Sequence, residues 1–559
     1  MPATSARVPR RLARSAATGV TLVALLATVA GCDPEKPPTG GGAASPSASA
    51  STKPAPGTPT PGAPKPGEST PGGPAPTTPA PGTPGPPSTP GPTTAPSTPP
   101  PAPGNGPLPF DLPSTAELRG SAKKVFAHYF TPYPISLNNK AGADDYYTKH
   151  YLRADGESGK HQAYGGLLRD RPLPRAPLAG DWELQDMETE IRTAVSAGID
   201  GFTVDLLNLD PSSPHRKRVD LLIKAAERVD PGFRIVLMPD MTASQIGGLD
   251  QNALAAALVG LAASKTVHRL DDGRLVVSPF KAEGRSAQWW TDFMKVMEQK
   301  YQQKVAFVPV FLNFGANAQA FAPISHGFSV WGNRSPKAQG NIANDVAKAH
   351  SMGKIWMQPV SVQDERPNQS IFDEAGNTEN LRATWEGAVE KGADWVQLTT
   401  WNDYSEGTQL APSVHNGRVY LDISSYYLTW FKRGAKPAIV RDVAYVTHRR
   451  QFVGTKPTGA GQSKFMAPRG GSTTPRDTVE ALVFLTSPAN VRVQSGAQTR
   501  DGQAGAGVTA LVHPLADGAQ SVTVTRGPGT VASVTSPFEV GRDLVVQDLQ
   551  YVAAGSARK

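Results

Sequence analysis

The chain has 559 residues, and its 56 lysine and arginine residues only slightly outnumber its 48 aspartate and glutamate residues. This modest positive charge, without any basic run that contains interleaved aromatic residues, argues against a nucleic-acid partner. The only cysteine is Cys32, so the chain cannot form an internal disulfide, and its stability must come from the core that a chain of this length can bury.

Residues 1–32 have the pattern of an export signal. Several arginines precede an apolar stretch at 20–29, which is too short to span a membrane as an ordinary helix. The stretch ends in small residues followed by Cys32, as in a bacterial lipoprotein signal, where this cysteine becomes the first mature residue and carries lipid. We therefore expect an extracellular protein that is lipid-anchored to the outer face of the bacterial cytoplasmic membrane. The alternative is an ordinary secretory signal that contains a cysteine by chance.

Residues 33–117 are predicted to form a disordered linker. Up to about residue 107 the composition is almost entirely Pro, Thr, Gly, Ser and Ala, which lacks the apolar side chains that offset the entropy of ordering. Proline-rich chain extends about 3.1 Å per residue, so roughly seventy residues reach on the order of 200 Å. That length is enough to hold a folded region beyond a thick cell wall.

Residues 118–437 show strand patterns that alternate with helix patterns. Apolar runs predict strands at 125–129, 201–205, 234–239, 275–280, 305–312, 328–331, 354–360 and 395–401. The segments between them have apolar residues spaced three and four apart, which indicates helices that bury one face, although 313–326 is weak as a helix. Eight strand-then-helix units predict a (β/α)8 TIM barrel in the α/β class, and a doubly wound open sheet is the alternative.

Polar and aromatic side chains follow most of these predicted strands. The carboxyl ends of the strands form the active-site mouth of a barrel, so residues at these positions are expected to share one cleft. Taken alone, His128 suits a core position, and Asp205 or Asp240 suits a helix N-terminal cap. Because such residues recur at the same end of successive strands, we predict a substrate-binding set of His128, Tyr129, Asp205, Asp240, Trp331, Asn333 and Gln358.

Two long connections, 131–181 and 361–378, belong to the same mouth of the predicted barrel. The first is rich in tyrosine and the second is polar. Long insertions at this end of a barrel tend to be functional, and aromatic rings suit the C–H faces of sugars.

The eighth predicted strand runs into the most informative motif of the chain, Trp401-Asn402-Asp403-Tyr404-Ser405-Glu406-Gly407-Thr408. Paired carboxylates beside aromatic rings are what hydrolysis of a glycosidic bond requires, because one acid protonates the leaving oxygen and the other acts on the opposite face of the sugar. We predict that Asp403 and Glu406 are catalytic and that Trp401, Asn402 and Tyr404 bind substrate. The alternative is a strand-to-loop exit with ordinary solvated acids.

The pattern changes beyond residue 437 to short alternating strands separated by Gly, Pro, Asp and Ser. This pattern predicts an antiparallel β-sandwich at 438–559. The region has few aromatic residues for a sugar-binding platform, so we expect it to brace the barrel rather than to bind carbohydrate.

Three segments carry a resemblance to a known family: 125–129 with 134–136, 201–205, and 400–406. In this order they resemble glycoside hydrolase family 71, the α-1,3-glucanases or mutanases. The resemblance covers roughly 123–436 and not the C-terminal region, and it implies hydrolysis of α-1,3-glucan with inversion and without a metal or other cofactor. Ser405 stands where the family commonly has glycine, which affects the conformation of the loop rather than its chemistry.

The resemblance also implies that Asp403 and Glu406 are the acid/base pair. Inversion requires the two carboxyl groups to lie about 6.5–9.5 Å apart, which leaves room for water. We expect Glu406 to be the general acid and Asp403 the general base, with the exchanged roles as an alternative and Asp205 as a reserve for the second carboxylate. Two further alternatives are an α-mannan-type glycosidase, because family 99 has a related motif, and a catalytically idle surface lipoprotein that binds glycan. We expect a monomer.

Overall fold

The computed structural model describes residues 107–541 and 544–558. The predicted export signal at 1–32, the lipidation of Cys32 and residues 33–106 of the predicted linker lie outside the described residues. Within the described part of the chain, no helix is long and apolar enough to cross a membrane.

The described chain is folded before residue 118, where the sequence predicts that the linker ends. Phe110 is buried and forms a β-bridge with Ile439. Helix α1 (Thr115–Gly120) follows, and the side chain of Ser114 accepts a hydrogen bond from the Glu117 backbone as its N-terminal cap. Residues 107–117 therefore pack onto the folded region.

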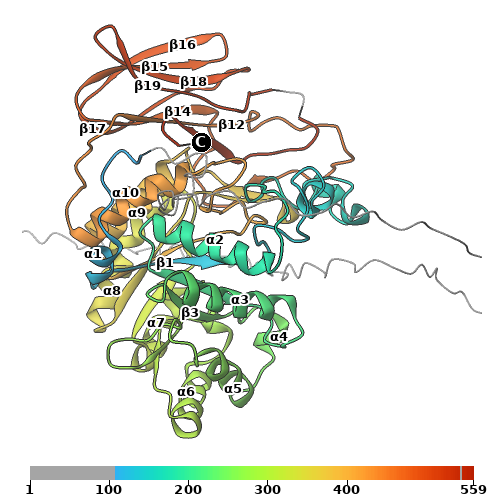
Figure 1. Ribbon diagram of the computed structural model, residues 1–559, viewed down its shortest axis with the longest axis vertical. Coiled ribbons are helices and arrows are strands. Elements are labelled where there is room, and N and C mark those ends of the chain that lie inside the picture. The colour runs from blue at the N-terminus through green and yellow to red at the C-terminus, as the bar shows by residue number, and fades with distance from the viewer. Residues whose placement is uncertain (1–106, 542–543, 559) are drawn as a thin grey trace, which may run out of the picture. The chain divides into compact units, whose positions relative to one another are not determined.

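A nine-stranded parallel sheet forms the centre of the fold, with helices packed around it (Figure 1). Its strand order is β5-β4-β3-β2-β1-β11-β8-β7-β6. The strands are β1 (Lys124–Tyr129), β2 (Gly201–Leu206), β3 (Arg234–Pro239), β4 (Leu275–Val277), β5 (Val305–Phe307), β6 (Val310–Phe311), β7 (Gly327–Val330), β8 (Ile355–Val360) and β11 (Trp395–Leu398).

The two ends of this strand order are formed by one stretch of chain. Only Val308 and Pro309 separate β5 from β6. The backbone N–H of Val308 donates to Val277 O of β4 at 2.9 Å, and that of Ser329 of β7 donates to Pro309 O at 3.0 Å. Proline has no N–H to donate to the ladder, which accounts for the break between β5 and β6.

Helices α2 to α10 follow the strands along the chain. Asn313 caps α7 by accepting a hydrogen bond from Ala316 N at 3.2 Å. The segment 313–326, whose sequence pattern is weak for a helix, therefore still forms two helical turns. The helices are α2 (Trp182–Ser196), α3 (Pro214–Val229), α4 (Ser244–Gly247), α5 (Gln251–Leu261), α6 (Ala287–Tyr301), α7 (Phe314–Phe321), α8 (Ile342–Ser351), α9 (Glu379–Glu390) and α10 (Val419–Arg433).

Both faces of the parallel sheet are apolar. On one face, Val125 and Ala127 belong to the large core that the helices cover. On the other face, Phe126 belongs to a second core that also contains Ala306 of β5 and Val310 of β6. Successive residues of a strand point to opposite faces, and a strand buried on both faces has the near-continuous apolar run seen in the sequence.

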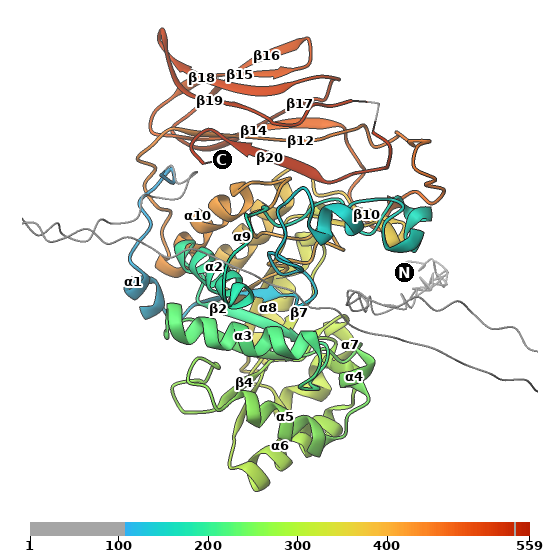
Figure 2. The ribbon, with the colours of Figure 1, turned by 45° about the vertical axis from the view of Figure 1, so that its right-hand side comes forward.

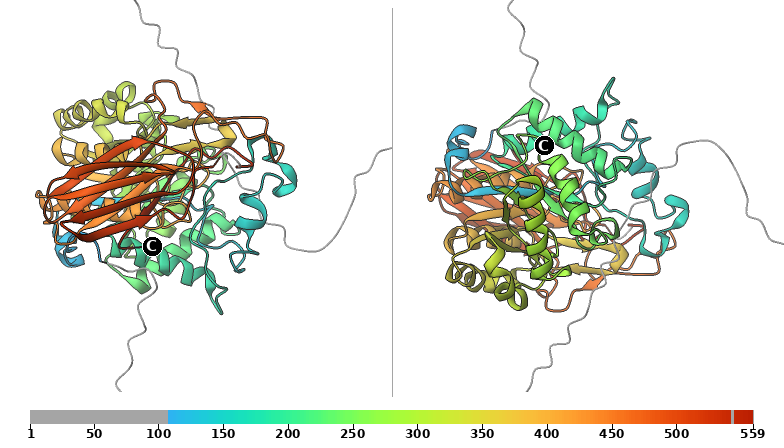
Figure 3. Two further views of the ribbon diagram at one scale, coloured as in Figure 1. Left: turned by 90° about the horizontal axis from the view of Figure 1, so that it is seen from above. Right: turned by 90° about the horizontal axis from the view of Figure 1, so that it is seen from below.

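Two antiparallel sheets form the C-terminal region and lie face to face (Figures 2 and 3). Their facing residues, such as Val446 and Val483 on one sheet and Val493 and Val522 on the other, share one hydrophobic core. The outer face of the first sheet packs on α10 through Tyr445 and its neighbours. The first sheet has the order β17 (Gly507–Pro514), β14 (Thr478–Leu485), β12 (Val443–Arg449), β20 (Tyr551–Gly555), and the second has the order β16 (Gln498–Ala504), β15 (Ala489–Ser495), β18 (Gln520–Arg526), β19 (Gly529–Thr535).

A small third sheet joins the two regions. Strands β9 (Asp364–Arg366) and β10 (Ile371–Asp373) form an antiparallel hairpin in the connection after β8. Strand β13 (Ala467–Pro468), which lies between β12 and β14 in the chain, pairs in parallel with β10. The C-terminal region thus contributes a strand to a hairpin of the other region, a feature that the sequence does not predict.

A buried ion pair strengthens this connection. Arg449 of β12 lies 2.9 Å from Glu374, which follows β10, and both side chains are at most 1% exposed. The hydroxyl of Tyr551 in β20 donates to the other oxygen of Glu374 at 2.6 Å. Buried charges need such partners, so these contacts join the C-terminal sheets firmly to the chain around β10.

Candidate active site

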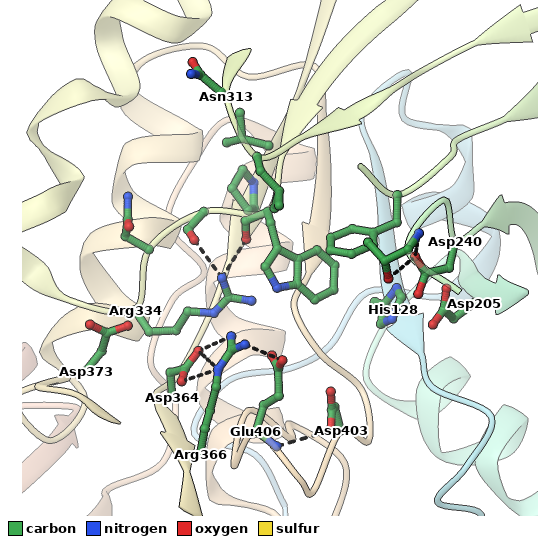
Figure 4. A pocket seen from close by; sticks show the side chains of 18 of the residues that line it. His128, Asp205, Asp240, Asn313, Arg334, Asp364, Arg366, Asp373, Asp403 and Glu406 are labelled. Atoms are coloured by element: carbon green, nitrogen blue, oxygen red, sulfur yellow. Dashed lines mark hydrogen bonds and ion pairs between the residues drawn. The ribbon is translucent and has the colours of Figure 1, made fainter. Parts of the chain in front are cut away.

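A cavity of about 600 Å³ lies at the carboxyl ends of the parallel strands. Its wall combines His128 of β1, Asp205 of β2, Asp240 directly after β3, and Gln358 of β8 with the loop that follows β11 (Figure 4). Eight of the predicted site residues line it: His128, Asp205, Asp240, Trp331, Asn333, Gln358, Asp403 and Glu406. Side chains that are far apart in the sequence therefore meet at one mouth of the sheet.

Four other predicted site residues do not line the cavity. Tyr129 and Trp401 point toward α2, where the Tyr129 hydroxyl donates to the sulfur of Met187 at 3.4 Å and the Trp401 ring N–H donates to Glu190 at 2.7 Å. Both side chains are 0% exposed. Strand alternation explains the position of Tyr129, since in β1 the neighbour of the inward-pointing His128 must point outward, whereas Trp401 lies beyond the end of β11.

The other two, Asn402 and Tyr404, hold loops together. The amide of Asn402 accepts from Phe130 N at 2.7 Å and donates to Phe130 O and Tyr133 O at 3.0 and 2.8 Å. Tyr404 is 1% exposed and packs in a tyrosine-rich cluster with Tyr133 and Tyr147. These residues join the loop after β11 to the loop after β1, and they support the site from behind.

The loop that carries the two predicted catalytic acids is fixed by its own hydrogen bonds. Thr400 Oγ1 accepts from Asp403 N at 2.8 Å and bonds to Thr408 Oγ1 at 2.8 Å. Gly407 has φ 63°, and a Cβ at this position would lie 2.8 Å from the side chain of Gln550 and 3.2 Å from that of Glu365. Only glycine combines this left-handed backbone with such close neighbours.

Asp403 is held in one orientation. Its Oδ1 accepts hydrogen bonds from the Ser405 backbone at 3.0 Å, the Ser405 hydroxyl at 2.7 Å and the Glu406 backbone at 3.2 Å. Burial raises the pKa of Asp403 above its ordinary value, while the hydrogen bond from Ser405 and the charge of Arg366 act in the opposite direction. Ser405 thus stabilises the ionised form of Asp403.

Glu406 points into the cavity and pairs with Arg366. Arg366 Nη1 lies 2.5 Å from Glu406 Oε1, and Arg366 Nη2 lies 2.6 Å from Asp364 Oδ2 (Figure 4). Burial raises the pKa of Glu406 to about 8, and the charges of Asp403 and Asp364 add to this, whereas Arg366 lowers it. Burial prevails over the ion pair because the single guanidinium is shared between two carboxylates.

Two further carboxyl groups lie on the opposite side of the cavity. Burial raises the pKa of Asp205 well above its usual range, and the negative charges of Asp240, Asp403 and Glu406 raise it further. Among the residues that the structure describes, none bonds to Oδ1 of Asp205. Asp240 accepts two hydrogen bonds from Thr242, both at 2.7 Å. A protonated Asp205 is therefore able to donate a hydrogen bond into the cavity.

Aromatic rings form the floor of the cavity. The rings of His128 and Phe280 contact Trp331 with centroid distances of 4.9 and 4.8 Å. Burial lowers the pKa of His128 to about 3, and Arg334 contributes to this, so the imidazole is neutral at ordinary pH. Trp331 is only partly buried, and an aromatic surface of this kind suits the C–H face of a sugar.

The charged residues of the small third sheet and its surroundings were not predicted from the sequence. Asp364, Arg366 and Asp373 lie on β9 and β10, Arg334 follows β7, and Arg469 follows β13; all five line the cavity. The density of charge in the polar connection 361–378 is the one signal that could have indicated them. No group of three or more His, Cys, Asp and Glu in the described chain is arranged to hold a metal ion.

The chain is similar to several known proteins. Residues 178–549 match the model of the family described as Glycosyl hydrolase family 71. A mutanase of Penicillium rubens is 25% identical over 394 residues, which cover 65% of this chain and 83% of that protein. An ascus wall endo-1,3-alpha-glucanase of Schizosaccharomyces pombe is 24% identical over 252 residues, 42% of this chain and 56% of that protein. Among solved structures, the GH99 endo-alpha-mannosidase from Bacteroides thetaiotaomicron has a TM-score of 0.43 and 15% identity and covers 55% of this chain and 97% of that one.

The extent of the family match corrects one expectation. The sequence motifs indicate a resemblance that ends near residue 436, whereas the match continues to residue 549 and includes most of the C-terminal sheets. The motifs occur only at the ends of the parallel strands, so they carry no information about the later region. The position of Arg469 in the cavity wall gives a physical reason for a continuous match.

Proposed function

This chain belongs to glycosyl hydrolase family 71, and we propose that it hydrolyses α-1,3-linked glucan with Asp403 and Glu406 as its acid/base pair. The observation that carries this proposal is that both carboxyl groups line one cavity, together with a partly exposed tryptophan ring. The similarity to a mutanase and to an endo-1,3-alpha-glucanase supports the choice of substrate.

The proposed fold of the catalytic region is a closed (β/α)8 barrel. Strands β5 and β6 are then two halves of a fifth strand, because residues 305–311 bond to β4 on one side and to β7 on the other. Side chains from both ends of the strand order also share the second apolar core, as expected for the interior of a barrel. An experimental structure in which residues 305–311 bond to only one of these neighbours would contradict closure.

In the proposed reaction, Glu406 starts protonated and Asp403 starts ionised. As the glycosidic bond breaks, Glu406 gives its proton to the leaving oxygen. A water molecule attacks the anomeric carbon from the opposite face, and Asp403 takes a proton from that water. One water is consumed, the configuration at the anomeric carbon is inverted, and exchange of one proton with solvent restores the starting state.

The proposed organisation places this enzyme outside the cell. Residues 1–32 are the lipoprotein signal, Cys32 carries the lipid anchor, and a linker leads to the catalytic region at 118–437 and the β region at 438–559. The basis is the small-residue segment before the only cysteine of the chain. Mass spectrometry of the mature N-terminus tests it, because a mature chain that begins beyond Cys32 would rule out the anchor.

Release of reducing sugar from insoluble α-1,3-glucan tests the proposed substrate. We expect hydrolysis of this polymer and little or no hydrolysis of α-mannan assayed in parallel. Because the mechanism inverts, the first sugar ends detected by NMR should have the β configuration. A higher rate on α-mannan would reject the proposed substrate, and first products of α configuration would reject inversion.

The pH dependence of kcat/KM should be bell-shaped. Activity requires a protonated Glu406, so it should fall as the pH rises through about 8, the pKa to which burial raises this carboxyl. It also requires an ionised Asp403, whose pKa is raised by burial, so the acid limb should lie above the pH at which an ordinary aspartate titrates. Initial rates on a soluble α-1,3-linked oligosaccharide measure both limbs. Activity that stays constant from pH 6 to about 10 would show that Glu406 is not the acid.

A further inference from the structure

Five side chains of alternating charge line one wall of the cavity. Arg366 connects Glu406 with Asp364, at 2.5 Å and 2.6 Å. Arg469 then connects Asp364 with Asp373, through contacts of 3.2 Å from Nη2 and 2.9 Å from Nε. The proposed general acid is thus joined through Arg366 and the shared Asp364 to Arg469 of the C-terminal region.

Backbone pairing fixes the place of Arg469. The Ala467 N–H donates to Ser370 O at 3.0 Å, and the N–H of Arg469 itself donates to Phe372 O at 2.8 Å, so the chain is held against β10 up to the arginine. A few residues later, the Thr473 N–H donates to the Ser335 hydroxyl at 2.7 Å, beside the cavity. Arg469 therefore directly follows β13, and its own backbone is bonded to β10.

The hairpin that holds Arg366 contains a conflict of charge. Asp364 and Asp373 lie directly opposite each other in the β9–β10 ladder. Like charges in this arrangement repel and destabilise the pairing. Burial and the charge of Asp364 raise the pKa of Asp373, while Arg469 lowers it. Arg469 binds both carboxylates and so stabilises the observed geometry of the hairpin, in which Arg366 reaches Glu406.

We propose that Arg469 is a positioning residue for glycoside hydrolysis: the C-terminal region, through this side chain, holds Asp364 and thereby places the Arg366 guanidinium on Glu406. This inference rests on the proposed role of Glu406 as the general acid. It makes the C-terminal region part of the active-site wall, beyond the bracing role that its sequence predicts.

The Arg469→Ala variant tests the proposal. Without Arg469, Asp364 competes more strongly for Arg366, and the carboxyl of Glu406 loses part of its ion pair. We expect kcat to fall by about 10- to 100-fold with little change in KM, because a misplaced acid slows the chemical step more than binding. The alkaline limb of the pH profile should move upward by roughly half a pH unit or more, because Arg366 favours the ionised form of Glu406.

Arg476→Ala is the matched control. Arg476 lies, like Arg469, in the connection between β13 and β14, and both side chains are 32% exposed. Arg476 contacts Gly376 O at 2.8 Å and Glu379 at 3.0 Å, but it does not contact Asp364. Loss of Arg476 weakens the attachment of the segment but leaves the alternating charges intact. We therefore expect the alkaline limb of this variant to stay in its wild-type position.

A rescue experiment separates charge from packing. Asp373→Asn removes the repulsion within the hairpin, so the Arg469→Ala/Asp373→Asn double variant should regain part of the lost kcat. The proposal is overturned if Arg469→Ala keeps the wild-type kcat and pH profile, or if Arg476→Ala reproduces both of its effects.

A second readout does not depend on turnover. The Glu406 carboxyl can be titrated by infrared difference spectroscopy, with the Glu406→Gln variant identifying its band. We expect its midpoint to rise in Arg469→Ala and to stay constant in Arg476→Ala. The proposed function fails if the wild-type protein hydrolyses neither α-1,3-glucan nor α-mannan. Even then, this titration decides whether Arg469 acts on Glu406. A midpoint that is unchanged in Arg469→Ala would overturn the inference.

Discussion

Asp403→Asn and Glu406→Gln will each lower kcat on α-1,3-glucan by at least about 100-fold, because general acid and base groups contribute roughly 10²–10⁴ to such rates. Both substitutions keep the shape of the side chain. The amide oxygen introduced at position 403 can still accept the hydrogen bonds that Ser405 and the backbone of residue 406 donate. The amide oxygen introduced at position 406 can still accept a hydrogen bond from Arg366. The loop should therefore keep its conformation. Reducing-sugar release measures the loss, and thermal unfolding should show little change in stability.

The same two variants distinguish acid from base. A glycosyl fluoride needs no proton on its leaving group, so Glu406→Gln should retain substantial activity on it, whereas Asp403→Asn should not. The reverse pattern would exchange the two roles. Asp394→Asn is the matched control, since Asp394 lies just before β11, at the opposite end of the same strand, and its side chain is 37% exposed. Near-normal hydrolysis of glucan by Asp403→Asn or Glu406→Gln would remove that residue from the mechanism.

Arg366→Met should have the largest effect on stability. The substitution keeps an unbranched side chain of similar reach but leaves Glu406 and Asp364 without the cation that lies between them. Removal of one partner from a buried ion pair costs about 3–5 kcal/mol, because the remaining charge stays buried. Urea unfolding at neutral pH measures the difference, and the activity of the folded fraction should also fall.

The pH dependence of this loss follows from Asp364. Burial raises the pKa of Asp364, but Arg366, Arg469 and Arg334 together lower this pKa below its ordinary value. In the wild type, the contribution of Asp364 to stability is therefore present above the pKa of an unfolded aspartate and is lost as the pH falls. Without Arg366 the folded-state pKa rises, so the variant should be least stable at neutral and alkaline pH and closest to the wild type in acid.

The control for Arg366→Met is Arg492→Met. Arg492 pairs with Asp501 at 2.7 Å on the second antiparallel sheet, and both side chains are more than 60% exposed. Water and salt screen an exposed pair, so its loss should have little effect and this variant should unfold nearly as the wild type does. A loss for Arg366→Met no greater than that of the control would show that the shared guanidinium contributes little to stability.

The parallel strands were predictable because they are buried on both faces. Continuous apolar runs marked the strands of the parallel sheet, with β5 and β6 in one run, and eight of the residues predicted at or near the ends of these strands line the cavity. Strands β16 and β19 have only a weak strand pattern in the sequence, since they are largely exposed. Strands β9, β10 and β13 are only two or three residues long and exist because they pair with one another.

The carboxylates of the site were predictable, but their cationic partners were not. Asp403 and Glu406 share one short motif, whereas Arg469 and Asp364 are separated by 105 residues and meet only through β13. No local pattern encodes such a contact. The aromatic residues of the motif were assigned to the substrate on residue type alone, and the sequence does not show that Trp401 turns toward α2 while Asp403 turns toward the cavity.

The contribution of β13 to the cavity wall has a consequence for biosynthesis. Glu406 leaves the ribosome before Arg469, so a growing chain contains both proposed catalytic acids while the wall of its cavity is still incomplete. On the proposed role of Arg469, full hydrolytic activity arises only after β13 has paired with β10. A chain cut short after α10 would lack this positioning contact, so its kcat would be reduced, and full activity would coincide with the end of folding.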